Sequence, residues 1–119
     1  MEKVNIKEKL SVFSDFWNPR ILGELNGQYV KAVKLKGSFV WHSHDHEDEL
    51  FLVINGKLRM EFRDKITIVS EGEFIIVPRG VEHKPVADEE VELLLFEPVS
   101  TRNTGNVENE RTKRNLERI

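Results

Sequence analysis

Apolar and polar residues alternate in short runs along most of the chain, and turn-forming residues separate the runs. Such alternation is typical of half-buried β-strands, because successive side chains point to opposite faces. The predicted strands are 21–25, 28–35, 38–44, 49–54, 57–63, 66–69, 73–77, 83–86 and 91–97. No long segment before residue 105 repeats its apolar residues at the period of a helix. The pattern therefore predicts an all-β antiparallel sandwich or barrel with little helix.

The dipeptide Asn-Gly occurs twice between apolar runs, at Asn26-Gly27 and at Asn55-Gly56. Both residue types accept positive φ, so each pair predicts a hairpin with a two-residue turn. In the second hairpin, Glu49 would lie opposite Phe62. If Glu49 points into the barrel, every second residue of both strands does so too, namely Phe51, Val53, Leu58, Met60 and Phe62.

This register predicts an apolar pocket around a polar centre. We expect Phe51, Met60 and Phe62 to line it, although all the inward residues could instead simply fill the core. Arg79, in the turn Pro78-Arg79-Gly80, is a fourth candidate for the lining, because it could attract an anionic substrate. No carboxylate other than Glu49 is placed inside the barrel.

The two ends of the chain differ from its middle. Residues 1–99 are interpreted as one barrel domain that includes an N-terminal strand or arm, which ends at Asn18-Pro19. Residues 100–119 carry many charges and few apolar side chains, so they are predicted to form a polar tail or a short terminal helix.

The bulk composition narrows the class of protein. The chain has 119 residues, 39% of them hydrophobic and 33% charged, which is ordinary for one soluble globular domain. The net charge of −3 gives no reason to expect a nucleic acid or an anionic membrane as partner. The absence of cysteine excludes disulfides and thiolate chemistry. With no apolar run long enough for a bilayer and no signal-peptide stretch, we expect a cytoplasmic protein.

Three histidines and one glutamate have spacings that suit a single metal centre. His42 and His44 point the same way on a strand, Glu49 begins the next strand, and His83 returns after a later turn. Imidazole and carboxylate together favour a divalent transition metal. Taken singly, each of them could be an ordinary core or surface residue. His46 lies among acidic residues where the chain must turn, so we expect a solvated loop residue. Asp45 and Asp48 are candidates for holding the second nitrogen of a ligand histidine, or are simply solvated.

These spacings resemble the two motifs of the cupin superfamily, at 37–56 and 72–87. The first motif reads Gly37, His42-x-His44, four residues, Glu49, six residues, Gly56; the second reads Gly72, five residues, Pro78-x-Gly80, two residues, His83. The interval from Gly37 to His42 is one residue shorter than usual, and Ala87 replaces the final Asn of the second motif. The chain is most similar in character to the small single-domain "cupin 2" proteins, some loosely called mannose-6-phosphate isomerase-like.

The resemblance implies an antiparallel double-stranded β-helix, or jelly-roll barrel. It also implies one divalent metal ion, such as Fe, Mn, Ni or Zn, held by His42, His44, Glu49 and His83. The function expected is that of a metal-binding cupin with a pocket for a small organic molecule. It could be a metal-dependent enzyme of the dioxygenase, isomerase or decarboxylase class, with catalytic residues left open. The alternative is a non-catalytic, metal-dependent binding protein, which the apolar lining and the lack of a spare general base favour slightly.

An outward row of aliphatic side chains indicates association. The register turns Leu50, Leu52 and Ile54 away from the barrel, and three such side chains in a row require cover. A homodimer is the first expectation, and cover by the N-terminal segment is the alternative. The tail after residue 99 could then wrap the partner subunit.

Overall fold

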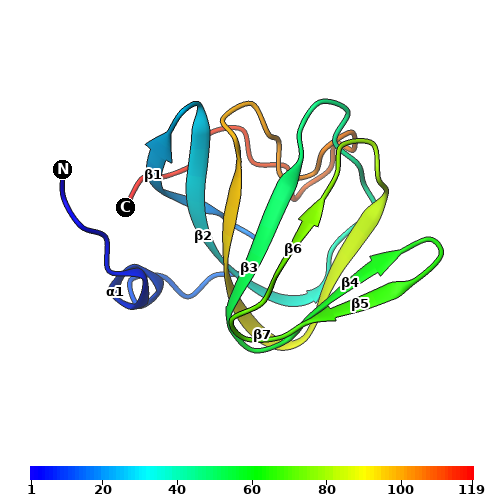
Figure 1. Cartoon of the computed structure of the whole chain (residues 1–119), viewed down its shortest axis with the longest axis horizontal. Helices are drawn as coiled ribbons and strands as arrows, with labels where there is room; N and C mark the ends of the chain where they lie inside the picture. Colours follow the sequence, from blue (N-terminus) through cyan, green and yellow to red (C-terminus); the bar gives the residue numbers. More distant parts are fainter.

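Two long strands, β2 (Gln28–Ser38) and β7 (His83–Pro98), pair along most of their length and connect the rest of the sheet (Figure 1). The computed structural model describes all residues 1–119. The other elements are α1 (Ile6–Leu10), β1 (Arg20–Leu25), β3 (Glu49–Asn55), β4 (Leu58–Phe62), β5 (Ile66–Val69) and β6 (Phe74–Val77). β2 lies between β1 and β7, β7 also pairs with both β3 and β4, and β1, β5 and β6 form the outer edges. All strand pairs are antiparallel, which confirms the predicted all-β jelly-roll barrel.

The long strands bend at Gly37, where they pass from one side of the barrel to the other. The register between β2 and β7 shifts between Leu35 and Gly37, and Gly37 has a φ of 89°. A bulge with a glycine in this conformation is a common means of curving a sheet. The segments 83–86 and 91–97, predicted separately, are therefore one bent strand.

The two Asn-Gly pairs form different structures. Asn26 and Gly27 both have positive φ, 51° and 76°, and join β1 to β2 as the predicted hairpin. The second hairpin was predicted wrongly, because β3 and β4 do not pair with each other. At Asn55-Gly56 only the glycine has a positive φ, 91°, and the chain there connects β3 to β4, which pair with different parts of β7. The inward face was nonetheless assigned correctly for Glu49, Phe51, Val53, Leu58 and Met60, which are all buried.

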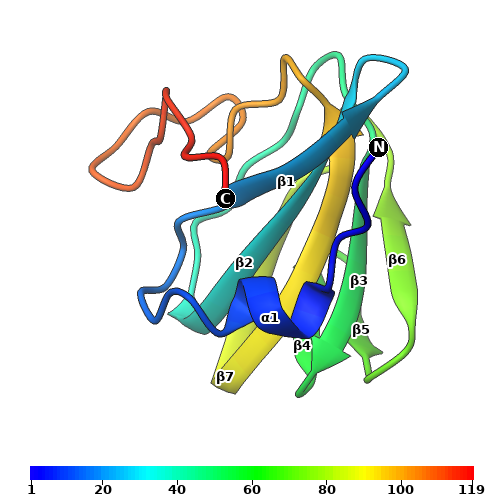
Figure 2. The same cartoon turned by 90° about the vertical axis from the view of Figure 1, so that its left-hand side faces the viewer.

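The N-terminal region contains a helix where a strand or arm was expected. Asn5 accepts a hydrogen bond from Glu8 N at 3.0 Å and caps α1, which is five residues long and not able to cross a membrane. Asn-x-x-Glu before an apolar residue is a capping signal that the strand interpretation overlooked. Leu10 packs against Ala32 and Leu94 on the outer face of the sheet, where Figure 2 shows α1 lying across the strands.

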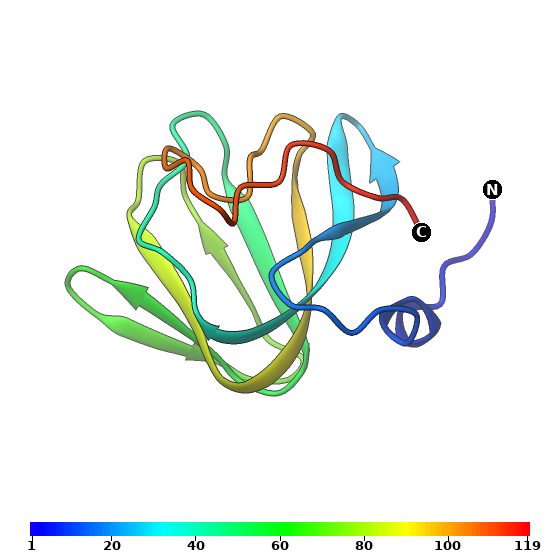
Figure 3. The same ribbon diagram turned by 180° about the vertical axis from the view of Figure 1, so that it is seen from behind.

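Residues 100–119 return along their own barrel. Ile21 N donates to Glu117 O at 2.9 Å, and Ile119 N donates to Ile21 O at 3.1 Å, so the last residues pair with the start of β1. Figure 3 shows this segment passing across the barrel before it ends beside β1. The barrel interior is filled by a cluster of buried aliphatic and aromatic side chains, among them Val33, Val53, Leu58, Met60 and Leu93. A cluster of buried polar side chains, His42, His44, Glu49 and His83, lies next to this core.

Candidate metal centre

His42, His44, Glu49 and His83 converge at one end of the barrel. All four are buried, and one donor atom from each lies within 4.8 Å of the others. Glu49 begins β3 and His83 begins β7. His42 and His44 come from residues 38–44, predicted as a strand but largely irregular, with one bridge between His42 and His83. Two backbone hydrogen bonds of 3.1 and 2.9 Å make this bridge and fix the two histidines side by side.

Backbone carbonyl groups orient two of the imidazoles. Nδ1 of His42 lies 2.9 Å from Val40 O, and Nδ1 of His83 lies 2.9 Å from Val81 O. An Nδ1–H that donates to a carbonyl leaves Nε2 unprotonated and able to bind a metal. Asp48, a candidate for this orienting role, instead accepts hydrogen bonds from Arg79 N at 2.8 Å and Arg79 Nε at 3.3 Å.

Glu49 lies between the other ligand candidates. Its Oε1 is 2.8 Å from His44 Nε2 and 3.2 Å from His83 Nε2. The contact with His44 lacks the alignment of a hydrogen bond, so His44 Nε2 is a buried nitrogen without a hydrogen-bond partner. Such an atom is costly in a folded protein unless something else binds it. The donor set and this unsatisfied nitrogen fit a divalent transition metal ion.

The protonation states also fit metal binding. Burial, aided by the neighbouring His83, lowers the pKa of His42 to about 4. Burial alone would raise the pKa of Glu49, but its close polar contacts with Glu97, His44 and His83 outweigh burial and lower that pKa well below its usual value. Near neutral pH the centre therefore offers an uncharged His42 imidazole and an ionised Glu49 carboxylate, the forms that metals bind.

Glu97 is a candidate site residue that the sequence pattern did not reveal. It is buried on β7 beside Glu49, so the expectation of no second carboxylate inside the barrel was wrong. Burial and then the charge of Glu49 raise its pKa well above the usual value. Alternation along β7 turns Val91, Leu93, Leu95 and Glu97 inward. The sequence alone does not tell which residues of this strand face inward, because Leu93, Leu94 and Leu95 are all apolar.

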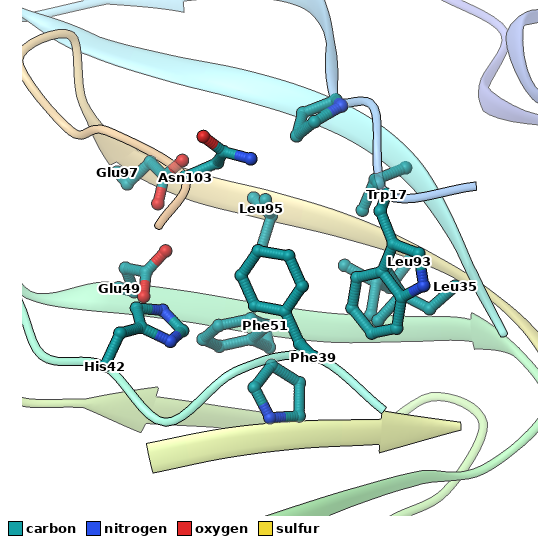
Figure 4. A pocket seen from close by; sticks show the side chains of 13 residues that line it. Trp17, Leu35, Phe39, His42, Glu49, Phe51, Leu93, Leu95, Glu97 and Asn103 are labelled. Atoms are coloured by element: carbon teal, nitrogen blue, oxygen red, sulfur yellow. The ribbon is translucent and has the colours of Figure 1, made fainter. Parts of the chain in front are cut away.

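A pocket extends from the polar centre toward the surface (Figure 4). It contains about 440 Å³ of empty space, counting its open mouth. His42, Glu49, Glu97 and Asn103 form its polar end, and its other walls are mostly apolar: Trp17, Pro19, Val33, Leu35, Phe39, Phe51, Pro85, Leu93 and Leu95. The rings of Trp17 and Phe39 stack with centroids 4.8 Å apart. Trp17 has a positive φ of 61°, which is unusual for a bulky residue.

Of the four residues predicted to line the pocket, the structure places only Phe51 there. Met60 is buried in the core beneath it, and Phe62 borders a separate surface hollow. Arg79 pairs with Asp48 at the exposed turn, because the side chains in that turn point outward. His46 is exposed in the acidic loop and stands apart from the four ligand candidates.

A family model described as "Cupin domain" (Cupin_2) matches residues 30–97. This range is more than half of the chain and contains both motifs, at 37–56 and 72–87. The chain is a cupin. The matched region includes all four ligand candidates and Glu97.

Relatives of this cupin share both sequence and fold. It is 43% identical to a cupin-2 domain containing protein from Shewanella frigidimarina NCIMB 400, with a TM-score of 0.79 over 80% of this chain and 93% of that one. Protein NMB1881 from Neisseria meningitidis is 31% identical, with a TM-score of 0.75 over 82% of this chain and 99% of that one. The uncharacterized protein YdbB of Bacillus subtilis (strain 168) is 32% identical over 80 residues. These are 66% of this chain and 65% of that relative, so the match spans just under two thirds of its length.

Proposed function

We propose that this cupin binds one divalent transition metal ion through His42, His44, Glu49 and His83, and that the ion holds a small organic molecule in the adjoining pocket. The observation that carries the proposal is the convergence of four buried donor atoms within 4.8 Å, at the polar end of an apolar pocket. Iron, manganese, nickel and zinc all suit imidazole and carboxylate donors.

The residues of the chain have separate tasks in this proposal. The carbonyls of Val40 and Val81 orient His42 and His83, and Glu49 supplies the negative charge. Trp17 stacks on Phe39, and the Phe39 ring meets the His42 ring edge-on with centroids 5.4 Å apart, so these aromatic rings would cover one side of the centre. When bound, a metal with three imidazoles and one carboxylate keeps coordination positions through which it can polarise a carbonyl or activate water or dioxygen.

Two uses of such a centre are proposed, in order. The first is a metal-dependent enzyme acting on the bound molecule, of the dioxygenase, isomerase or decarboxylase class. The second is a non-catalytic, metal-dependent binding protein. Two features favour the second, the apolar lining and the expected lack of a further carboxylate inside the barrel. Glu97 removes the latter feature, because it places a second carboxylate at the same end of the pocket.

Elemental analysis of protein purified without chelators or a nickel column tests the metal proposal. We expect about one transition metal ion per chain in the wild type, and loss of the metal in His83→Gln. His46→Gln is the matched control, since His46 is exposed outside the cluster, and it should keep the metal. Wild-type protein that takes up none of the four metals on reconstitution would contradict the proposal.

We further propose a cytoplasmic homodimer that forms through the outer face of β3 and β6. In that face Leu50 lies opposite Ile76, and Leu52 lies opposite Phe74. Phe74 and Ile76 are 60% and 53% exposed, while α1 covers only the part of the face around Leu52 and Ile54. A second copy of the chain would cover what the helix leaves open.

A further inference from the structure

A buried ion pair lies beside the polar end of the pocket. Lys31 Nζ on β2 and Glu97 Oε1 on β7 are 2.7 Å apart, and the two side chains are only 2% and 1% exposed. Both face inward because alternation on their strands directs Lys31, Val33 and Leu35, and likewise Leu95 and Glu97, into the barrel. A lysine and a glutamate this deeply buried are uncommon in proteins.

The second carboxylate oxygen of Glu97 has no partner within the protein. Oε2 is fully buried and accepts no hydrogen bond, although Glu97 lines the pocket. Figure 4 shows its carboxylate on the same side of the pocket as Glu49, with the Asn103 side chain nearby. No hydrogen bond joins Asn103 to it; the Asn103 Nδ2 donates to Arg111 O at 2.8 Å and the Oδ1 accepts from Lys113 N at 2.9 Å.

A carboxylate oxygen that is buried without a donor destabilises the protein unless a molecule in the pocket supplies one. We propose that Glu97 Oε2 accepts a hydrogen bond from a ligand hydroxyl group, and that the ligand is a small 2-hydroxycarboxylic acid with a flat apolar body. This inference rests on the proposed function, because the carboxylate end of the ligand would bind at the metal centre.

Charge favours an acid as the ligand. Imidazoles bind a metal only in the neutral form, so three of them with the Glu49 carboxylate would leave a divalent ion with one uncompensated positive charge, while Lys31 and Glu97 balance each other. A monoanionic carboxylate would neutralise the centre. A protonated amine could also donate to Glu97, but it would add positive charge to a buried site that already carries an excess.

The position of Glu97 favours a hydroxyl next to that carboxylate. Glu97 and Glu49 line the same end of the pocket, so a donor that reaches Glu97 lies beside the metal ligands rather than at the far end of the pocket. The remaining walls suit an apolar body, with Phe51, Leu93 and Leu95 along the pocket and the Trp17 indole stacked on Phe39 at its mouth.

Calorimetric titration of the metal-loaded protein with mandelate and phenylacetate tests the inference. The two acids have the same carboxylate and ring, and only mandelate has the 2-hydroxyl group. We expect the wild type to bind mandelate at least about tenfold more tightly, as for a hydrogen bond to a charged acceptor. In Glu97→Gln, Lys31 retains the amide oxygen, so the hydroxyl meets a neutral amide NH₂ group and no longer a charged acceptor. The preference should then fall severalfold, with the metal content unchanged.

Two further variants complete the experiment. If Glu97→Gln does not fold, the double variant Lys31→Met with Glu97→Met removes both charges together and should also abolish the preference. Trp17→Ala should weaken the binding of both acids equally. Equal wild-type affinities for the two acids, or no binding of either, would overturn the ligand assignment. Loss of metal from Glu97→Gln would mean that Glu97 only positions Glu49. Failure of the wild type to bind metal would instead overturn the proposed function itself.

Discussion

Asn106 and Ser43 are joined by two hydrogen bonds of 2.9 Å, one from Asn106 N to Ser43 O and one from Ser43 N to Asn106 Oδ1. Ser43 stands between His42 and His44, so this pairing holds the backbone that carries two of the candidate metal ligands. The C-terminal segment thus acts as a support for the centre. Residues 38–44 make few strand hydrogen bonds of their own, which makes this support necessary.

Gly105 allows the C-terminal segment to approach so closely, and Gly105→Ala should disturb it. A Cβ atom there would collide with Ser43 O and lie 3.1 Å from His42 Cδ2. We expect a loss of about 1–3 kcal/mol in the free energy of unfolding and weaker metal binding. Urea unfolding and metal titration measure the two effects.

Gly72→Ala is the matched control for this substitution. Gly72 also has a positive φ, 79°, but a Cβ atom there would meet no atom within 4 Å. Gly72→Ala should therefore lower the free energy of unfolding only through the strained backbone conformation, by about 1 kcal/mol, and the variant should keep its metal affinity. Equal effects of the two substitutions would show that the contact with Ser43 is unimportant.

The candidate ligands could be found from the sequence because their arrangement depends on short intervals. His42 and His44 are two residues apart, and strand alternation beyond Glu49 indicated the inward face even though the predicted hairpin partner was wrong. The alternation belongs to the strand itself, whereas the pairing depends on which distant strand lies beside it. The same dipeptide, Asn-Gly, makes a hairpin at residues 26–27 and joins two strands that do not pair with each other at residues 55–56.

The rest of the pocket lining could not be predicted from short intervals in the sequence, because its residues come from distant parts of the chain. Trp17 reaches the pocket mouth from the N-terminal segment, where its backbone adopts a positive φ that nothing local predicts. Lys31 and Glu97 are 66 residues apart and meet only through the pairing of β2 with β7. Each would be interpreted alone as a solvated charge, since only the pair makes their burial tolerable.

The metal-free protein should lose stability as the pH falls from about 6.5 to about 4. Folded His42 has a pKa of about 4, whereas in the unfolded chain a histidine titrates near pH 6.5. Between these values the unfolded state binds more protons, so the free energy of unfolding decreases on acidification, by about 3 kcal/mol for this residue. The contribution of neutral His42 to the free energy of unfolding is complete above pH 6.5 and is lost at about pH 4.

Urea unfolding of chelator-treated wild type and His42→Asn, compared across this range, isolates the contribution of His42. Other groups, including Glu97 with its raised pKa, titrate in both proteins and cancel in the difference. The difference in stability should change with pH only between about 4 and 6.5. A difference that is independent of pH would mean that His42 is not held neutral by burial.

Sedimentation velocity at micromolar concentration tests the proposed homodimer. Ile76→Lys introduces a charge into the outer face of β3 and β6 and should convert a wild-type dimer to monomer. Ile68→Lys on β5 is the matched control, because Ile68 and Ile76 are 52% and 53% exposed but lie on different strands of the barrel surface. A wild type that sediments as a monomer, or equal effects of both substitutions, would exclude this interface.

The ion pair between Lys31 and Glu97 should show strong coupling in a double-mutant cycle. Lys31→Met leaves Glu97 without its buried cation, and Glu97→Met leaves a buried lysine with no anion. Breaking a buried pair from one side typically costs about 3–5 kcal/mol, whereas replacing both partners with apolar residues is often neutral. We therefore expect the double variant to be more stable than either single variant. Urea unfolding of the metal-free proteins at neutral pH measures this without a contribution from metal binding. Single losses that simply add in the double variant would mean that the two charges do not stabilise each other, and that Glu97 is held in place by packing alone.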